Sequence, residues 1–369
     1  MYTITDKEKT IELLNDWYVE MRARNVGDAR SIKEKLELQF SSSINDEITI
    51  QDEELLLYYA LLDFRYNHLV DNLRISKDSF NKIESFSKPS EGFLAYYYHF
   101  FKAIYFSEVG NFNDAREEYE KADNLLKFVP DKLEKAEFYY KLSTYYYYTQ
   151  QSLLAVKYAS KAKDIFTNYN GNEVNKAFCD NVLGLACTYL REWELAEEHF
   201  AAAMDQFQKV GEERFILMTR HNLGWLYAKQ NLSELSLRYL SEVVEKSPNH
   251  YKAIYVKAKE HFKLGQTEEA NALIERGLKI SYDLQQEEYQ HRNMILKAMN
   301  NNYSAEKLED TILTGITYFD REELYDNVQD YYEILGAKCY EEELHVKSSK
   351  YFYLGMQAKK ESAAKGALV

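Results

Sequence analysis

The chain has 369 residues, 46% of them hydrophobic, which is enough for a sizeable core in one long array or in two to three compact domains. No run of 18 apolar residues occurs and the charged N-terminus lacks the apolar core of a signal peptide, so we expect a cytoplasmic protein that does not enter a membrane. The net charge of −14 argues against direct binding to nucleic acid, because a polyanion would be repelled.

Cysteine usage predicts a reduced protein without a metal centre. An odd number of cysteines without CxxC spacing argues against both a disulfide framework and a zinc site. The chain also lacks the GxGxxG, Walker, HExxH, GxSxG and EF-hand motifs. We therefore expect no metal and no cofactor, and we expect buried thiols at the three cysteines, Cys179, Cys187 and Cys339.

Three amphipathic helices are predicted within residues 1–70, because apolar residues recur there at helical spacing in three separate stretches. The residues that mark the stretches are Leu13, Leu14, Trp17 and Met21; then Ile32, Leu36 and Phe40; then Leu55, Leu56, Tyr59, Leu62 and Tyr66. Helices of this length predict a small three-helix bundle. Its 8 Lys or Arg against 14 Asp or Glu leave no basic recognition helix, which argues against a DNA-binding head.

Residues 71–92 are predicted to be a linker. This stretch, DNLRISKDSFNKIESFSKPSEG, is polar and contains Lys88-Pro89-Ser90, which is typical of a connecting segment. A hinge here would let the bundle swing against the rest of the chain. Small-angle scattering profiles that stay the same with and without bound ligand would count against this hypothesis.

Residues 93–369 contain an internal repeat. The phrases GNFNDAREEYEKA, REWELAEEHFAAA and GQTEEANALIERG have small and large residues in the same order, and the scarcity of proline (3) suits long helices. This is the pattern of the tetratricopeptide repeat, in which two antiparallel helices occupy about 34 residues. Units begin at Tyr96, Ala136, Ala177, Leu217 and Tyr251, with a weaker unit near Gln329 and a degenerate one over 289–322. The predicted fold is all-α, a three-helix bundle followed by a right-handed superhelix.

The first helices of such a superhelix line a concave groove, which commonly holds extended peptides. Peptide binding is therefore the leading prediction, and a scaffold with an unoccupied groove is the alternative. His221 lies on a first helix and could face the groove, although a packing or surface role is the favoured interpretation.

The phrases LNDWYVEMRARNVGDA (14–29) and DEELLLYYALLDFRYNHLVDNL (52–73), followed by this array, resemble the Rap family of Bacillus and its phages and plasmids. The resemblance implies a three-helix bundle that binds a response regulator or another transcription regulator, and an array that binds a secreted and re-imported Phr pentapeptide. It also implies that the peptide closes the molecule and releases the target. Some family members dephosphorylate a response regulator, and others only sequester their target.

The position of the family's catalytic glutamine argues against phosphatase activity here. Phosphatase members carry the pattern DQxLL, whereas this chain has DEELL, which places Glu53 at that position. An amide can orient the water that attacks an acyl phosphate, but a carboxylate would repel the phosphate. Gln51 lies two residues earlier and would project from a different face of a helix. By the resemblance, Glu53 and Tyr58 belong to the target-binding surface.

The resemblance also implies a peptide-binding set in the array. The family holds the peptide backbone with an asparagine in the fourth repeat, and HNLGWLY supplies Asn222 at that position. Two acidic family positions that meet a basic peptide residue correspond here to Tyr189 and Arg292, which suggests a peptide of different sequence. Tyr148, with Tyr140 and Tyr147, is expected in the same groove, although core packing suits each tyrosine equally well.

The sequence therefore leaves three alternative functions open. The first is a peptide-controlled protein that sequesters a regulator. The second, the alternative, is a response-regulator aspartyl-phosphate phosphatase, and the third is a general adaptor without a peptide signal. A homodimer through the C-terminal repeat is left open.

Overall fold

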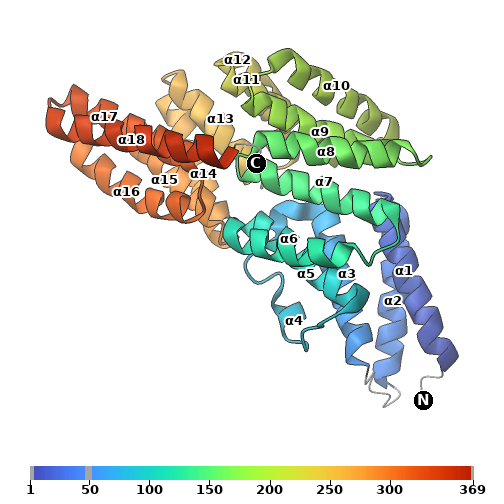
Figure 1. The fold of residues 1–369 in the computed structure, drawn as a ribbon. Coiled ribbons are helices and arrows are strands. Elements are labelled where there is room, and N and C mark those ends of the chain that lie inside the picture. Colours follow the sequence, from blue (N-terminus) through green and yellow to red (C-terminus); the bar gives the residue numbers. More distant parts are fainter. Residues whose placement is uncertain (1–3, 46–51, 367–369) are drawn as a thin grey trace.

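A computed structural model describes residues 4–45 and 52–366, and within these ranges all regular structure is helical. The predicted bundle consists of α1 (Ile4–Arg22), α2 (Val26–Asn45) and α3 (Glu53–Asp71), which lie together at one end of the molecule (Figure 1). The all-α fold class and the bundle are confirmed. Gln51 lies outside the described residues.

The predicted apolar faces form the bundle core. Leu14, Trp17 and Met21 recur three or four residues apart on α1 and are fully buried, and Leu36 of α2 and Leu62 of α3 meet them. The Asp52 carboxylate caps α3 by accepting a hydrogen bond from the Leu55 amide at 3.2 Å.

The segment predicted as a linker is packed more closely than its polar composition suggests. It contains a 3₁₀ turn, Asn72–Arg74, and the short helix α4, Asn81–Glu84. Phe80 is buried, and its ring centroid lies 5.2 Å from those of Phe64 and Tyr105. A few apolar residues among many polar ones are enough to attach the segment to α3 and to α5 (Gly92–Val109). Motion at a hinge in this segment stays a prediction.

The array contains seven helical hairpins within the described residues, and each predicted unit coincides with one. The degenerate stretch 289–322 lies in the sixth hairpin. The pairs are α5 (Gly92–Val109) and α6 (Phe112–Leu126), α7 (Lys132–Tyr148) and α8 (Ser152–Thr167), α9 (Glu173–Tyr189) and α10 (Trp193–Val210), α11 (Glu213–Lys229) and α12 (Ser233–Lys246), α13 (Tyr251–Lys263) and α14 (Thr267–Asp283), α15 (Glu287–Asn300) and α16 (Ala305–Arg321), and α17 (Tyr325–Glu341) and α18 (His345–Gly366).

The repeat pattern has a direct steric cause. A Cβ atom at Gly184 would lie 2.7 Å from the Phe200 ring, and one at Gly224 would lie 2.7 Å from Leu240 Cγ. The small residue on each first helix thus admits the large residue of the second helix. The cysteines are buried free thiols, as predicted. None of the described helices has the length and apolar character that a membrane crossing requires.

The superhelix of the array turns far enough for its sixth hairpin to contact its first. The Glu322 carboxylate at the end of α16 accepts a hydrogen bond from the Phe112 amide at the start of α6, at 2.7 Å. The Tyr318 hydroxyl donates to the Gly110 carbonyl at 2.8 Å, and α18 contacts α8 (Figure 1). Repeats usually contact only their neighbours. Here the first and sixth hairpins meet and enclose the concave side of the array.

Candidate peptide-binding site

The concave side of the array holds a groove of about 1230 Å³. Its walls come mainly from the end of α3 and from the first helices of the repeats, α5, α7, α9, α11, α13, α15 and α17. This volume exceeds the roughly 300–1,000 Å³ of sites for drug-sized ligands, so a short peptide can be accommodated. The prediction that first helices line the groove is confirmed.

Asn222 lies in the middle of α11, on the groove wall, and is buried. Its Nδ2 donates to Asn181 Oδ1 at 2.9 Å, and its Oδ1 lies 3.0 Å from His221 Nδ1. These neighbours hold the amide in one orientation. His221 also lines the groove, and its ring packs against His250 with the centroids 4.7 Å apart, so the packing role and the position on the groove wall occur together.

Three aromatic rings form a platform beside Asn222. The centroids of Tyr147, Tyr189 and Trp225 lie 5.0–6.1 Å from one another, and all three residues line the groove. Lys229 places its ammonium 5.3 Å from the Tyr189 centroid and 5.8 Å from that of Trp225. Tyr189 therefore lies where an apolar side chain of a peptide could rest.

Arg292 projects from α15 into the same groove. Its Nη2 lies 2.7 Å from Glu288 Oε1 and donates to Asn327 Oδ1 at 3.2 Å. The guanidinium also faces the rings of Tyr255 and Tyr289, each 5.8 Å from its carbon to the centroid. Arg292 is therefore held in place before any ligand arrives.

Tyr148 connects the groove wall to a buried carboxylate. Lys252 of α13 lies 3.5 Å from the Tyr148 hydroxyl and 3.9 Å from Glu108 Oε2. Burial opposes ionisation of Glu108, but a hydrogen bond from His68 and the charge of Lys252 hold the pKa of its carboxyl at about 2. The carboxylate is therefore charged and paired at neutral pH.

Hydrogen bonds continue from Glu108 into the bundle. His68 Nε2 lies 3.1 Å from Glu108 Oε1, and Arg65 Nη1 lies 3.3 Å from His68 Nδ1. Because arginine can only donate, Nδ1 accepts and Nε2 carries the proton. Burial and the nearby Lys141 charge lower the pKa of His68 to about 3, which agrees with a neutral ring. Arg65 then donates from Nη2 to Glu137 Oε1 at 2.6 Å.

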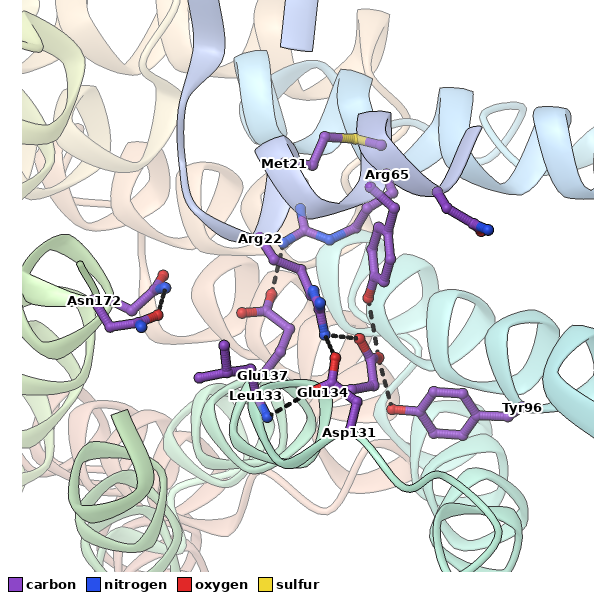
Figure 2. Close-up of polar contacts among 12 residues, drawn as sticks. Met21, Arg22, Arg65, Tyr96, Asp131, Leu133, Glu134, Glu137 and Asn172 are labelled. Atoms are coloured by element: carbon purple, nitrogen blue, oxygen red, sulfur yellow. Dashed lines mark hydrogen bonds and ion pairs between the residues drawn. The ribbon is translucent and has the colours of Figure 1, made fainter. Parts of the chain in front are cut away.

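The bundle docks on α7 through a buried polar cluster, the junction network, in which side chains of α1 and α3 bind carboxylates of α7 (Figure 2). Arg24 and Arg65 both bind Glu137, at 2.7 and 2.6 Å, and all three side chains are at most 3% exposed. Burial alone would raise the pKa of Glu137, but the two guanidiniums hold it at about 2.

A second carboxylate completes the junction network. Glu134 Oε1 accepts from the hydroxyls of Tyr18 and Tyr96, both at 3.0 Å, and its Oε2 accepts from Arg22 at 3.1 Å (Figure 2). Arg22 also binds Asp131, which caps the start of α7 by accepting from the Leu133 amide at 2.8 Å. The bundle is thereby fixed to the helix that carries Tyr147 and Tyr148.

The two residues assigned to target binding lie outside the groove and do not share a contact. Glu53 is the first residue of α3, and its carboxylate accepts from the Ser87 amide at 2.7 Å, which lowers its pKa. The Tyr58 hydroxyl donates to Asn15 Oδ1 at 2.9 Å, and its ring stacks on Tyr97 at 5.9 Å. Tyr58 therefore contributes to packing between α1, α3 and α5.

Sequence reasoning missed the lysines of the groove wall. Lys229 follows Asn222 and Trp225 on α11 at spacings of three and four residues, and Lys252 and Lys259 lie seven apart on α13. Residues so spaced occupy one face of a helix. The small residues of each first helix face the second helix of the same hairpin. A search for lysines on the opposite face of the first helices could have found Lys229, Lys252 and Lys259.

Comparisons with known proteins agree with this architecture. A sequence model of "response regulator aspartate phosphatase H, N terminal" matches residues 4–71, and a tetratricopeptide repeat model matches residues 177–249. Regulatory protein RapF of Bacillus subtilis (strain 168) is 24% identical over 94% of this chain and 93% of its own length.

Two solved structures are similar over nearly all of the chain. A Rap protein complexed with competence and sporulation factor superimposes with a TM-score of 0.79 at 23% identity, covering 97% of this chain and 99% of its own. The Rap conjugation gene regulator of plasmid pLS20, in complex with the Phr* peptide, has a TM-score of 0.67 at 21% identity and covers 98% of each chain. The bundle and the repeats follow in the same order along the whole length, so in sequence and in fold the chain is similar to members of the Rap family.

Proposed function

We propose that this chain is a peptide-controlled regulator that sequesters a response regulator or another transcription regulator. In this proposal the bundle of residues 1–70 binds the target, 71–92 link it to the array, and the array of 93–369 binds a small Phr-type signalling peptide. Peptide in the groove favours the docked arrangement of bundle and array, in which the target is released.

One observation carries the proposal. A continuous set of buried polar contacts runs from the groove to the bundle, through Lys252, Glu108, His68, Arg65 and Glu137. A ligand that repositions Lys252 or Tyr148 therefore acts on a contact that holds the bundle. The complexes of the two similar Rap structures with a factor and a peptide support the same assignment.

The first test is an affinity pull-down from source-cell cytoplasm, with and without the cell's secreted small-peptide fraction. We expect one regulator to be captured by the immobilised chain and released when the peptide fraction is added. Capture of no specific protein, or capture that the peptide fraction does not change, would sink the proposal and leave only a repeat scaffold.

Asn222→Ala should abolish peptide-driven release while capture of the regulator continues. The alanine removes the amide that can both donate to and accept from an extended peptide backbone, so we expect affinity to fall at least about tenfold. The matched control is Asn175→Ala, which also removes a buried asparagine but lies outside the groove lining. Equal effects of the two substitutions would point to general destabilisation instead of peptide binding.

Glu53→Gln tests the phosphatase alternative. We expect the wild-type chain to leave a phosphorylated response regulator intact, and we expect the glutamine variant to accelerate its dephosphorylation at least about tenfold, because the amide can orient water without repelling phosphate. The rate of loss of radiolabelled phosphate is the readout, and Glu54→Gln, one residue along α3, is the control. No gain in the Glu53 variant would remove the support for placing Glu53 at the catalytic position.

A further inference from the structure

The groove has the opposite charge from the rest of the molecule. Eleven Lys or Arg and six Asp or Glu line it, a formal excess of five positive charges, in a chain whose net charge is −14. The cations are therefore concentrated on the surface that would meet a ligand. A recessed site lined by one sign of charge focuses its field on ligands of the opposite sign.

Most of the groove's carboxylates are already neutralised. Glu108 lies beside Lys252, Glu260 beside Lys263 at 2.7 Å, and Glu288 beside Arg292 at 2.7 Å, while Asp71 lies 2.9 Å from Arg74. Of the six carboxylates, Asp326 and Asp330 have no cation within ion-pair distance among the described residues. Two carboxylates of the groove, Asp326 and Asp330, therefore remain without an ion-pair partner in the described part of the chain.

The cations are much less completely paired. Within the described part of the chain, six of the eleven have no carboxylate within 4.0 Å, namely Lys141, Arg191, Arg214, Lys229, Lys259 and Lys359. Four of these six, namely Arg191, Lys229, Lys259 and Lys359, are exposed, so an anionic ligand in the groove can reach them. The uncompensated charge of the groove is therefore positive.

Lys229 of α11 and Lys259 of α13 both line the groove, and neither has a carboxylate within 4.0 Å among the described residues. Lys229 lies over the rings of Tyr189 and Trp225, and burial followed by the charge of Lys259 lowers its pKa, with Arg292 acting in the same direction. Asp330 and Asp326 act on it in the opposite direction. The Lys229 ammonium beside the aromatic platform, with Lys259 on the same groove wall, can receive an anionic side chain together with an apolar one.

A second cation marks the other end of the groove wall. Arg214 is the second residue of α11 and Lys229 the last, fifteen residues apart or about 22 Å along the helix axis, with Asn222 midway. Arg214 donates to the Leu69 and Val70 carbonyls of α3, and its Nη2 is buried without a partner among the described residues. An extended pentapeptide spans at most about 17 Å, so one centred on Asn222 has an end near each cation.

We propose that the groove takes an acidic peptide, with an Asp or Glu side chain seated between Lys229 and Lys259. This inference rests on the proposed peptide-binding function and adds the chemical class of the peptide. It follows that binding weakens as salt concentration rises, because salt screens the attraction between the groove and the peptide.

A positional-scanning library of synthetic pentapeptides with free C-termini tests the inference. Each pool fixes one position as Asp, Asn, Arg or Lys and randomises the others, and binding to the full chain is measured by competition with a fluorescent pool. At one position we expect the Asp pool to bind about tenfold more tightly than the Asn pool, because a charge-assisted hydrogen bond replaces a neutral one. The Arg and Lys pools should bind least tightly there.

The lysine pair is tested with Lys229→Met/Lys259→Met, which should reduce the Asp-to-Asn preference to about one. Lys257→Met is the matched control, since Lys257 lies on the same helix as Lys259 but not in the groove lining, and it should keep the preference. Tightest binding by the Arg or Lys pools, or equal binding by Asp and Asn pools at every position, would falsify the acidic class while peptide binding stands. No binding by any pool would overturn the proposed function as well.

Discussion

Replacing Glu137 with glutamine is expected to lower the free energy of unfolding by about 3–5 kcal/mol and to release the bundle from the array. Glu137 is the shared counterion of Arg24 and Arg65, and all three side chains are buried. The substitution keeps the shape of the side chain but leaves two guanidiniums without a negative partner. Urea unfolding at pH 7 measures the loss, and small-angle scattering detects the release of the bundle.

The pH dependence gives this prediction a second readout. The pKa of Glu137 is about 2 in the folded chain and 4.5 ordinarily, so its contribution is complete above about pH 4.5 and is lost as pH falls towards 2. The difference between wild type and variant should shrink over that window. Glu117→Gln is the control because its side chain is 70% exposed. A loss below about 1 kcal/mol at pH 7 would show that the junction network does not stabilise docking.

Charge and packing at the junction can be separated by a triple substitution, Arg24→Met, Arg65→Met and Glu137→Leu. Apolar replacement of a whole buried ionic group is often neutral or stabilising, so we expect stability near that of wild type. The polar connection from the groove to the bundle is nevertheless removed. Peptide should therefore still bind but should no longer release the captured regulator.

Replacing Lys141 with methionine is expected to stabilise the chain at neutral pH by up to about 5 kcal/mol. Lys141 is 8% exposed, and burial, followed by the charge of Arg65, lowers its pKa from 10.5 to about 7. Methionine fills a similar volume without a charge. The Lys141 carbonyl that accepts from the Tyr119 hydroxyl at 3.1 Å is unaffected by the change.

The sign of the pH effect distinguishes desolvation from a packing change. Between pH 7 and 10.5 the unfolded chain binds the Lys141 proton and the folded chain does not, so the wild type gains stability as pH rises through this window. The advantage of the variant should be complete below pH 7 and absent above 10.5. Urea unfolding at pH 6 and pH 10 measures it, with Lys132→Met, at an exposed lysine of the same helix, as the control. An advantage that is the same at both pH values would contradict the electrostatic explanation.

Sequence alone determined the helical hairpins of this protein and their order. The small residue at Gly184 and the large one at Phe200 belong to the same hairpin, so their complementarity repeats within each unit and can be read from a single chain. The tyrosine run 145–148 lies in α7, although tyrosine is a residue type that is enriched in strands. The repeat pattern also located the degenerate sixth hairpin. Asn222 was found differently, from the resemblance of one phrase to a known family.

Only the tertiary structure decided how the charges are paired and where the array closes. Arg65 meets Glu137 across 72 residues, and Glu322 meets the Phe112 amide across 210. No spacing relates such residues, because their distance depends on the summed rotation of all the hairpins between them. The unpaired cations of the groove could not be predicted from the sequence for the same reason. A lysine can be recognised as unpaired only when every carboxylate that could reach it has been placed in space.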